Sequence, residues 1–252
     1  MKNPDGSYNP NIQVGGPFSD VVGGTFQFAN PVNRLKNIVD KTKGVSLLIN
    51  AYAEADILED LKLKSTFNIS HNNSNRDQYF PSAVGNYRDP APSIPTGQFQ
   101  KSTLNNFLNE NILSYSKSFS QHNFQLLAGF SSQEERLEIS RILASNYPKN
   151  DDVITPNAAA TVRTEENVEK WTLVSYFGRL NYNLDNRYLF GATIRRDGSS
   201  RFGKNNRWGL FPSASFGRRV SQEEFFPEDN IVSSLKLRTS YGQVTDKLRI
   251  NW

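Results

Sequence analysis

Apolar and polar residues alternate with a period of two along much of this chain. In 47–57 every odd position is apolar, whereas the even positions include Asn50, Glu54 and Asp56. The alternation continues in 61–70, where leucine, phenylalanine and isoleucine alternate with lysine, threonine and asparagine. Because successive side chains of a β-strand point to opposite faces, the pattern predicts strands with one apolar and one polar face.

The same period predicts further strands downstream. These lie at 103–116, 122–132, 171–184, from 188 onward, 208–219 and 234–243. The clearest is 171–184, in which Val174, Tyr176 and Leu180 share one face while Ser175 and Arg179 share the other. The sequence therefore predicts an antiparallel, all-β fold.

The connections between these strands alternate in length. We predict tight turns at 58–60, 117–121 and 185–186 and long external loops at 71–102 and 134–170. A membrane barrel has short turns at its periplasmic end and long loops outside, whereas loops of about 30 residues are unusual in a compact soluble domain. The connection 220–233 blurs the rule, because it would be a long periplasmic turn.

Aromatic residues fit the same interpretation. Tyr182 and Tyr188 flank the turn at 185–186, and Trp171 and Trp208 begin strands at the opposite end. Amphipathic rings favour the two boundaries between membrane and water, so these residues are candidates for interfacial girdles. The alternative, that they are ordinary core residues of a soluble β-sandwich, stays open from the pattern alone.

Composition excludes several classes of protein. Mean hydropathy is −0.60, and no run approaches the roughly 18–20 apolar residues of a membrane helix. Barrel strands need only about 9–11 residues with alternating polarity, so they remain compatible. The chain has no cysteine, and its net charge of +4 comes from scattered basic residues, which argues against a nucleic-acid groove.

The N-terminal region differs from the rest. Residues 1–43 are rich in Asn, Pro and Gly and are predicted to be mostly loop, whereas 44–243 carries the strand pattern. The first residues lack the apolar core of a signal peptide, which an outer-membrane protein requires. We therefore expect the natural N-terminus to lie upstream.

One motif resembles a nucleotide-binding loop. Gly198–Asn205 is one residue short of the phosphate-binding pattern G-x4-G-K-[ST], since Asn205 replaces the hydroxyl that would bind magnesium. The following residues alternate and contain Pro212, so no helix N-terminus is available for a phosphate. We predict a hairpin loop instead, with Asp197-Gly198 as its turn and with Arg195, Arg196 and Arg201 solvated or facing the lumen.

No catalytic, cofactor-binding or metal site can be assembled from the remaining candidates. His71 and His122 have no nearby partner at metal-ligand spacing. Three adjacent carboxylate pairs fall in predicted loops or turns, where nothing fixes an acid–base geometry. They are Glu134-Glu135, Glu165-Glu166 and Glu223-Glu224. We therefore predict that the protein is not an enzyme, and that these carboxylates have structural or solvating roles.

Four stretches carry a family resemblance. YFGRLNYNLDNRYLFGATIRRDGSSRFGKNNRWGLFPSASFGRRVS at 176–221 resembles the C-terminal barrel of the SusC/RagA family of TonB-linked outer-membrane receptors. SSLKLRTSYGQ at 233–243 is similar to the next strand of that family. NPV at 30–32 and YAEADILEDLKLKSTF at 52–67 are similar to an earlier part of the same barrel.

The resemblance implies more than this chain contains. Such receptors have a plugged barrel of about 22 strands, of which this sequence supplies about eight or nine. The family continues after Gln243 with a Thr-Gly-Asn-like turn, but here Val244-Thr245-Asp246 follows. We therefore interpret 244–252 as a truncated tail, and we see no plug domain.

The implied function is energy-dependent import of oligosaccharides or peptides across the outer membrane of a Gram-negative cell. The implied partners are a SusD-like lipoprotein outside, outer-membrane lipid, and TonB–ExbB–ExbD acting through the absent plug; nucleic acid is not among them. The long loops 71–102 and 134–170 are candidates for contact with the lipoprotein or ligand. A passive porin and a secreted, glycan-binding β-sandwich are the alternatives. The sequence does not reveal the ligand-binding residues or the ligand.

Overall fold

A computed structural model describes residues 2–14, 26–85, 91–148, 154–226 and 232–243. In chain order the elements are β1 (Asn11–Val14), β2 (Phe26–Ala29), α2 (Pro31–Asn37), β3 (Val39–Leu58), β4 (Leu61–Phe80), β5 (Thr96–Phe119), β6 (His122–Ser145), η1 (Pro156–Ala158), β7 (Thr161–Leu184), β8 (Tyr188–Ser199), β9 (Trp208–Arg219), η2 (Val220–Gln222) and β10 (Lys236–Gly242). The predicted all-β class is confirmed.

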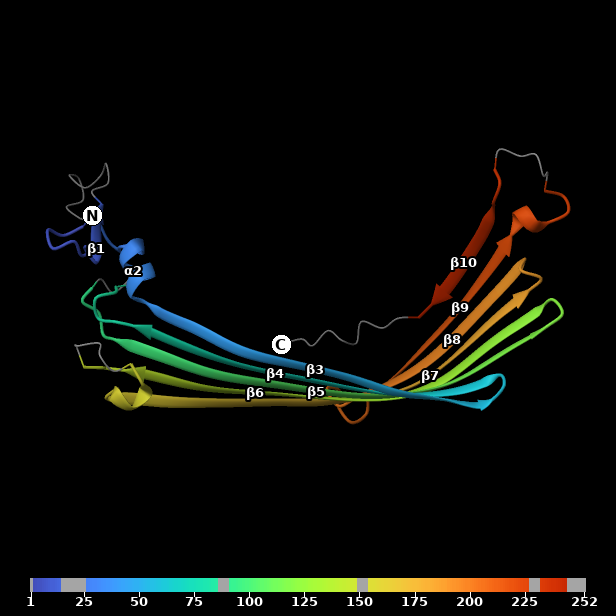
Figure 1. The fold of residues 1–252 in the computed structure, drawn as a ribbon, viewed down its shortest axis with the longest axis horizontal. Coiled ribbons are helices and arrows are strands. Elements are labelled where there is room, and N and C mark those ends of the chain that lie inside the picture. The colour runs from blue at the N-terminus through green and yellow to red at the C-terminus, as the bar shows by residue number, and fades with distance from the viewer. Residues whose placement is uncertain (1, 15–25, 86–90, 149–153, 227–231, 244–252) are drawn as a thin grey trace. The chain divides into compact units, whose positions relative to one another are not determined.

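Strands β3 to β10 form one sheet in which each strand lies beside its neighbour in sequence. The order β10-β9-β8-β7-β6-β5-β4-β3 is an up-and-down meander, and Figure 1 shows its strands running side by side. β1 and β2 form a separate antiparallel pair. Simple hairpin connections suffice because every neighbouring pair is antiparallel.

The predicted turn at 185–186 is confirmed. Asp185 and Asn186 have φ angles of 53° and 52°, and the backbone N–H of Arg187 donates to the carbonyl of Leu184 at 3.0 Å. Two consecutive positive φ values match the twist of the flanking strands, and Asp and Asn tolerate this conformation better than most residues. A tight connection between β7 and β8 follows directly from these two residues.

The predicted long loops 71–102 and 134–170 are wrong in their bounds. β4 continues to Phe80 and β5 starts at Thr96, while β6 continues to Ser145 and β7 starts at Thr161. The true connections are 81–95 and 146–160. In the β4 extension, residues 71–78 are polar on both faces, so alternation gives no signal there, although the backbone ladder itself requires no apolar residue. In the β6 extension Leu137 and Ile139 still alternate with Glu138 and Ser140, so the predicted loop overlooked a period that continues.

The longer strands also change one predicted aromatic position. Trp208 begins β9 as expected, but Trp171 lies well inside β7, which starts at Thr161. At about 3.3 Å per residue, the 24 residues of β7 extend over roughly 79 Å. A barrel strand needs only roughly 9–11 residues to cross a bilayer, so β7 has more than twice the number required.

The N-terminal region contains more structure than predicted. The side chain of Asn30 caps α2 by accepting from the backbone N–H of Val32 at 3.0 Å, and Pro31 occupies the first turn. Asn33 donates to the carbonyl of Ala83 at 2.7 Å, which fixes the helix against the 81–95 connection. The predicted boundary at residue 44 therefore falls inside β3. The predicted tail 244–252 lies outside the described residues.

The chain divides into two compact units, 1–46 with 72–104 and 137–169, and 47–71 with 105–136 and 170–252. In the first unit Tyr79, Ala144 and Tyr147 are buried together, and the rings of Tyr79 and Tyr147 meet edge to face with centroids 5.1 Å apart. All buried apolar residues of the described chain belong to this unit. The described residues of the second unit form a single sheet layer, and none of their apolar side chains is buried. Among the described residues, no helix is long and apolar enough to cross a membrane.

Candidate functional site

Strand register separates an apolar face from a polar face in β7–β10. Tyr182 lies opposite Phe190, and Phe190 lies opposite Phe216. One position along, Asn181 lies opposite Gly191, and Gly191 lies opposite Ser215. Directly opposed residues share a face of the sheet, so the aromatic rings form one face and the amide and hydroxyl groups form the other.

The apolar face is exposed. A row of rings crosses it from β6 to β9, with centroid separations of 4.6 Å for Phe124–Tyr182, 6.0 Å for Tyr182–Phe190 and 4.9 Å for Phe190–Phe216. Ile194 on the same face is 53% exposed. A soluble monomer rarely leaves so continuous an apolar surface in water. The face is therefore built to contact an apolar environment.

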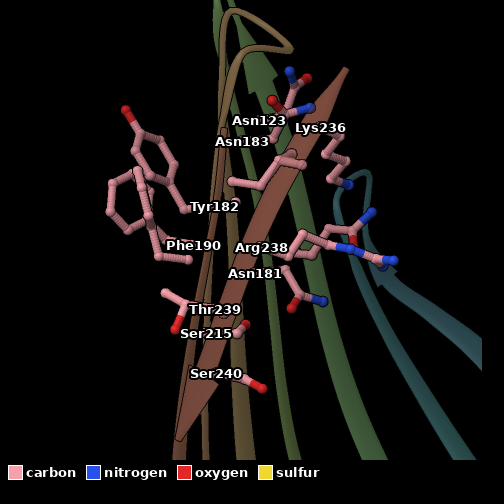
Figure 2. A pocket seen from close by; sticks show the side chains of 15 residues that line it. Asn123, Asn181, Tyr182, Asn183, Phe190, Ser215, Lys236, Arg238, Thr239 and Ser240 are labelled. Atoms are coloured by element: carbon pink, nitrogen blue, oxygen red, sulfur yellow. The ribbon is translucent and has the colours of Figure 1, made fainter. Parts of the chain in front are cut away.

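The polar face carries an open groove of about 590 Å³ between β6 and β10. Figure 2 shows Lys236, Arg238 and Asn181 on one side of the β10 ribbon and Tyr182 and Phe190 on the other. The polar lining is supplied by Asn123, Gln125, Asn181, Asn183, Ser215, Lys236, Arg238 and Ser240. These groups donate and accept hydrogen bonds, and two of them are cations.

Two glycines form part of the floor of this groove. A Cβ atom on Gly191 would lie 2.6 Å from Oγ of Ser215. A Cβ atom on Gly217 would lie 3.5 Å from Cγ of Arg238 and 3.5 Å from Cε of Lys236. Because these positions carry no side chain, the stems of Arg238 and Lys236 lie close over the strand and the groove reaches the backbone.

Ion pairing is uneven on the polar face. Nε of Arg195 contacts Asp197 at 2.8 Å, and Nη2 of Arg195 donates to the buried hydroxyl of Ser175 at 2.9 Å. Its guanidinium also lies 5.4 Å from the ring centroid of Phe177. Arg195 is thus held by three different partners, and the prediction that it is simply solvated or lumen-facing misses this cluster.

A second network joins β5, β6 and β7 to the 200–207 turn. Nδ2 of Asn106 donates to one carboxylate oxygen of Glu135 at 2.9 Å, and Nε1 of Trp171 donates to the other at 3.0 Å. The guanidinium of Arg201 lies 4.5 Å from a ring centroid of Trp171. Sequence reasoning missed this network because Glu135 was assigned to a loop, and its partners lie on three other segments of the chain.

The phosphate-loop resemblance does not lead to a phosphate site. Asp197 and Gly198 are not the turn that was predicted, because they belong to β8 and pair with Gly209 and Trp208. The turn is formed by 200–207, and β9 follows it, so the segment has no helix N-terminus for a phosphate. Arg196 lies over the ring of Trp208 at 4.8 Å and is exposed on the apolar face, so it does not lie on the same face as Arg195.

The histidines have non-metal partners. Nδ1 of His71 lies 2.6 Å from Oδ1 of Asn105, and Nδ1 of His122 lies 2.7 Å from Oη of Tyr182. Within the described ranges no group of three His, Cys, Asp or Glu residues is arranged to hold a metal ion. Each histidine is therefore accounted for by a cross-strand polar contact.

Two of the three glutamate pairs lie in strands rather than in the predicted loops. Glu134 is in β6 and contacts Nζ of Lys170 at 2.8 Å. Glu165 is in β7 and contacts Nη1 of Arg141 at 3.5 Å. Both pairs are cross-strand ion pairs at exposed positions, which contribute modestly to stability.

Glu223 organises the segment after β9. Its carboxylate accepts from Nε of Arg218 and from the hydroxyl of Tyr188, each at 2.9 Å, and lies 3.8 Å from Nη1 of Arg187. The hydrogen bond from Arg218, followed by that from Tyr188, lowers the pKa of Glu223 below its usual range. These contacts tie the start of the predicted long connection, at Glu223, back to β8 and β9.

Comparison with known proteins identifies the relatives of this sheet. No family model matches the chain. It is 33% identical to TonB-dependent receptor P3 of Formosa agariphila over 84% of this chain and 21% of the relative. It is 61% identical to TonB-dependent receptor SusC of Bacteroides thetaiotaomicron over 28% of this chain and 7% of the relative.

The chain belongs to the SusC/RagA family of TonB-dependent receptors. Its fold also matches the structure titled the RagAB peptide transporter, with a TM-score of 0.80, 21% identity, and coverage of 94% of this chain and 26% of that chain. The resemblance carried by 176–221 is thereby confirmed. This SusC/RagA-family chain spans about a fifth of the length of the curated receptor P3.

Proposed function

We propose that this chain forms part of the barrel wall of an outer-membrane receptor that imports nutrients by energy-coupled transport. The observation that carries the proposal is the division of β7–β10 into an exposed aromatic face and a grooved polar face. In a transmembrane barrel the outward face contacts lipid while the inward face lines an aqueous lumen. The apolar face would then contact lipid, and the groove would open into the lumen.

The remaining wall must come from other strands. β3 and β10 are the two edges of the described eight-stranded sheet, and each has a partner on only one side. Lipid cannot satisfy the free backbone groups of an open edge. The eight strands would therefore be a section of a barrel of about 22 strands, which encloses a plugged lumen.

Energy coupling and partners follow from the family as proposals. A plug domain would connect the barrel to TonB, ExbB and ExbD, and a SusD-like lipoprotein would cover the outer opening. Their support is the set of relatives named as TonB-dependent receptors, SusC among them. The cargo would be an oligosaccharide or a peptide.

The first compact unit is suited to hold an outer partner. The strands that enter it, β5, β6 and β7, each have 24 residues, more than the roughly 9–11 that a barrel strand needs to cross a bilayer, and its connections are ordered by specific contacts. Tyr147 lies in the small core and Ile154 packs against it, whereas the hydroxyl of Ser93 donates to the carbonyl of Val84 at 2.6 Å. A firm platform reduces the entropy lost when a partner binds.

The test replaces residues 146–160 of the whole receptor with a short Gly/Ser linker. Because this change removes Tyr147, lipoprotein association and uptake should both fall, while the barrel remains in the outer membrane. A matched receptor with a Gly/Ser replacement of 200–207, which lies in the other compact unit, should retain lipoprotein association. Unchanged association and uptake in the first variant would contradict the platform.

A passive porin makes a different prediction. Loss of TonB, or collapse of the proton gradient, should abolish uptake through the receptor. Uptake that continues at the normal rate under either condition would favour the porin.

A further inference from the structure

Strand β7 is paired on only one side over its first half. Its ladder with β8 begins at Leu173, which lies opposite Ser199. β8 ends at Ser199, and the chain returns through 200–207 into β9. Among the described residues, 161–169 of β7 therefore has β6 as its only strand neighbour. We call this segment the free edge.

The free edge differs from the edges of β3 and β10. Each of those strands ends the described sheet, and other strands of the receptor would pair with them. β7 instead lies inside the sheet, between β6 and β8, and its open side results from the place where β8 ends. The additional strands of a complete barrel would therefore not pair with 161–169, because the position beside β7 already belongs to β8.

The free edge presents unpaired backbone groups. Where the pairing ends, the carbonyl of Thr172 accepts from the backbone N–H of Ser200 at 2.9 Å, and the N–H of Thr172 donates to Oγ of Ser200 at 2.8 Å. Every second residue of an antiparallel strand directs both backbone groups to the same side. Because β7 is one uninterrupted strand, Glu166 and Val168 direct theirs to the open side. An extended segment can pair with such an edge as an added strand.

The sequence of the free edge does not protect it from pairing. Natural edge strands are commonly protected by proline, by lysine, by bulges or by short length. Residues 161–169 read TVRTEENVE, with neither proline nor lysine. Val162 and Val168 are 49% and 56% exposed, although β-branched side chains favour positions packed against a neighbouring strand. The segment is therefore suited to receive a further strand.

The charges of the free edge indicate which strand would fit. Glu165 contacts Arg163 at 3.3 Å and Arg141 at 3.5 Å, so these charges are matched. Neither Glu166 nor Glu169 has a cation within ion-pair distance among the described residues. Opposite charges that face each other across two strands stabilise the pairing, and like charges destabilise it. The free edge therefore favours a strand with basic residues opposite Glu166 and Glu169.

We propose that the free edge is a strand-addition site for a protein partner outside the membrane. An extended segment of the partner would pair antiparallel with β7 and place lysine or arginine opposite Glu166 and Glu169. The inference rests on the proposed function, which puts the first compact unit on the outer side of the membrane. A second copy of the receptor does not fit, because its β7 runs in the same direction in the same membrane and carries the same carboxylates.

The experiment measures binding of labelled synthetic peptides to the purified whole receptor by fluorescence anisotropy. The basic peptide is KVTKTTTVT, whose two lysines face Glu169 and Glu166 in the antiparallel register. One matched peptide has glutamate in place of both lysines. The other has N-methyl groups on its second, fourth and sixth residues, which removes the donors that face β7. The basic peptide should bind, and each matched peptide should bind about tenfold more weakly.

Receptor variants separate the free edge from any other peptide site. Val168→Pro removes a backbone N–H on the open side, where an edge strand tolerates proline, and should weaken binding of the basic peptide about tenfold. Val168→Ala keeps that N–H and is the matched control, so binding should be unchanged. Glu166→Gln should weaken binding about twofold to fivefold. Its control is Asp77→Asn, which removes an exposed carboxylate of β4 in the same unit and should have no effect.

Hydrogen exchange tests whether the edge is open in the whole receptor. The amides of Glu166 and Val168 should exchange freely in the receptor alone and become protected when the basic peptide is added. Protection in the receptor alone would overturn the proposal, because another part of the receptor would then cover the edge. Absence of binding, equal binding of the N-methylated peptide, or equal binding to Val168→Pro and Val168→Ala would also overturn it. If Val168→Pro fails to assemble, Glu166→Gln and the N-methylated peptide decide the question.

Transport separates this inference from the proposed function. If uptake requires TonB but the basic peptide does not bind the free edge, the strand-addition site is wrong and the import function stands. If loss of TonB leaves all uptake unchanged, the import function itself is wrong.

Discussion

Substitution of Gly129 by alanine should destabilise the sheet through a single contact. Gly129 lies in β6 and faces Phe177 of β7, whose ring covers it. A Cβ atom at this position would lie 2.2 Å from Cε2 and 2.2 Å from Cζ of Phe177. Such a distance is far inside van der Waals contact, so the ring must move or the strands must separate.

The magnitude follows from what the ring holds. Phe177 supports the guanidinium of Arg195, which is in turn bonded to Ser175 and Asp197. Inserting one methyl group into a well-packed site typically costs about 1–3 kcal/mol. We expect a loss in this range in the free energy of unfolding. Displacement of the ring should also loosen the contacts of Arg195.

The assay is urea unfolding of the whole receptor in lipid vesicles, with Gly203→Ala as the control. Gly203 has nothing within 4 Å of its Cβ position, so its substitution should change stability by less than about 0.5 kcal/mol. Combining Gly129→Ala with Phe177→Ala should cost less than the sum of the single changes, because the clash is gone. The reasoning would be refuted if Gly129→Ala left the free energy of unfolding unchanged. It would also be refuted if the losses of the two single variants added exactly in the double variant.

Three further predictions concern single side chains. The hydroxyl of Tyr147 is buried with no hydrogen-bond partner among the described residues, so Tyr147→Phe should leave the free energy of unfolding equal or higher. Tyr147→Ala should lower that free energy by about 3–5 kcal/mol, and a large loss in the phenylalanine variant would contradict this. Trp171→Phe leaves one oxygen of Glu135 without its donor and should cost about 1 kcal/mol in urea unfolding, and no loss would mean that the bond is immaterial. Hydrogen bonds from Arg218 and then Tyr188 lower the pKa of Glu223 from 4.5. Residues 220–226 should therefore be fully ordered above about pH 4.5 and lose that order as pH falls through the lowered pKa. Hydrogen exchange of the backbone amides of 220–226 measures the order, and equal protection in Glu223→Gln at neutral pH would contradict the prediction.

The sequence predicts the fold where one face meets an apolar environment. In 171–184 the alternation of Tyr176 and Leu180 with Ser175 and Arg179 identifies both the strand and its two faces, and the structure confirms them. The turn at Asp185-Asn186 is equally local, because it depends on two residues that tolerate positive φ. Where both faces are polar, as in 71–78 of β4, the period disappears although the ladder continues.

The polar groove is less accessible to sequence reasoning. Asn181, Ser215 and Arg238 come from three strands, and their proximity depends on the register that joins β7 through β10. No short motif records that register. The same limit explains why Glu135 and Trp171, which are 36 positions apart, were not paired. A signal was nevertheless present, since Arg179, Lys236 and Arg238 occupy the polar positions of their strands.

The two-faced wall is the central claim, and site-directed spin labelling of the whole receptor in its membrane tests it most directly. This chain contains no cysteine, so single cysteines can be placed at successive positions from 190 to 195 in a receptor whose remaining sequence has any cysteine replaced by serine. Labels at 190, 192 and 194 should be accessible to oxygen dissolved in lipid, and labels at 191, 193 and 195 to a water-soluble nickel reagent. Uniform accessibility to the nickel reagent at all six positions, with no period of two, would contradict the account.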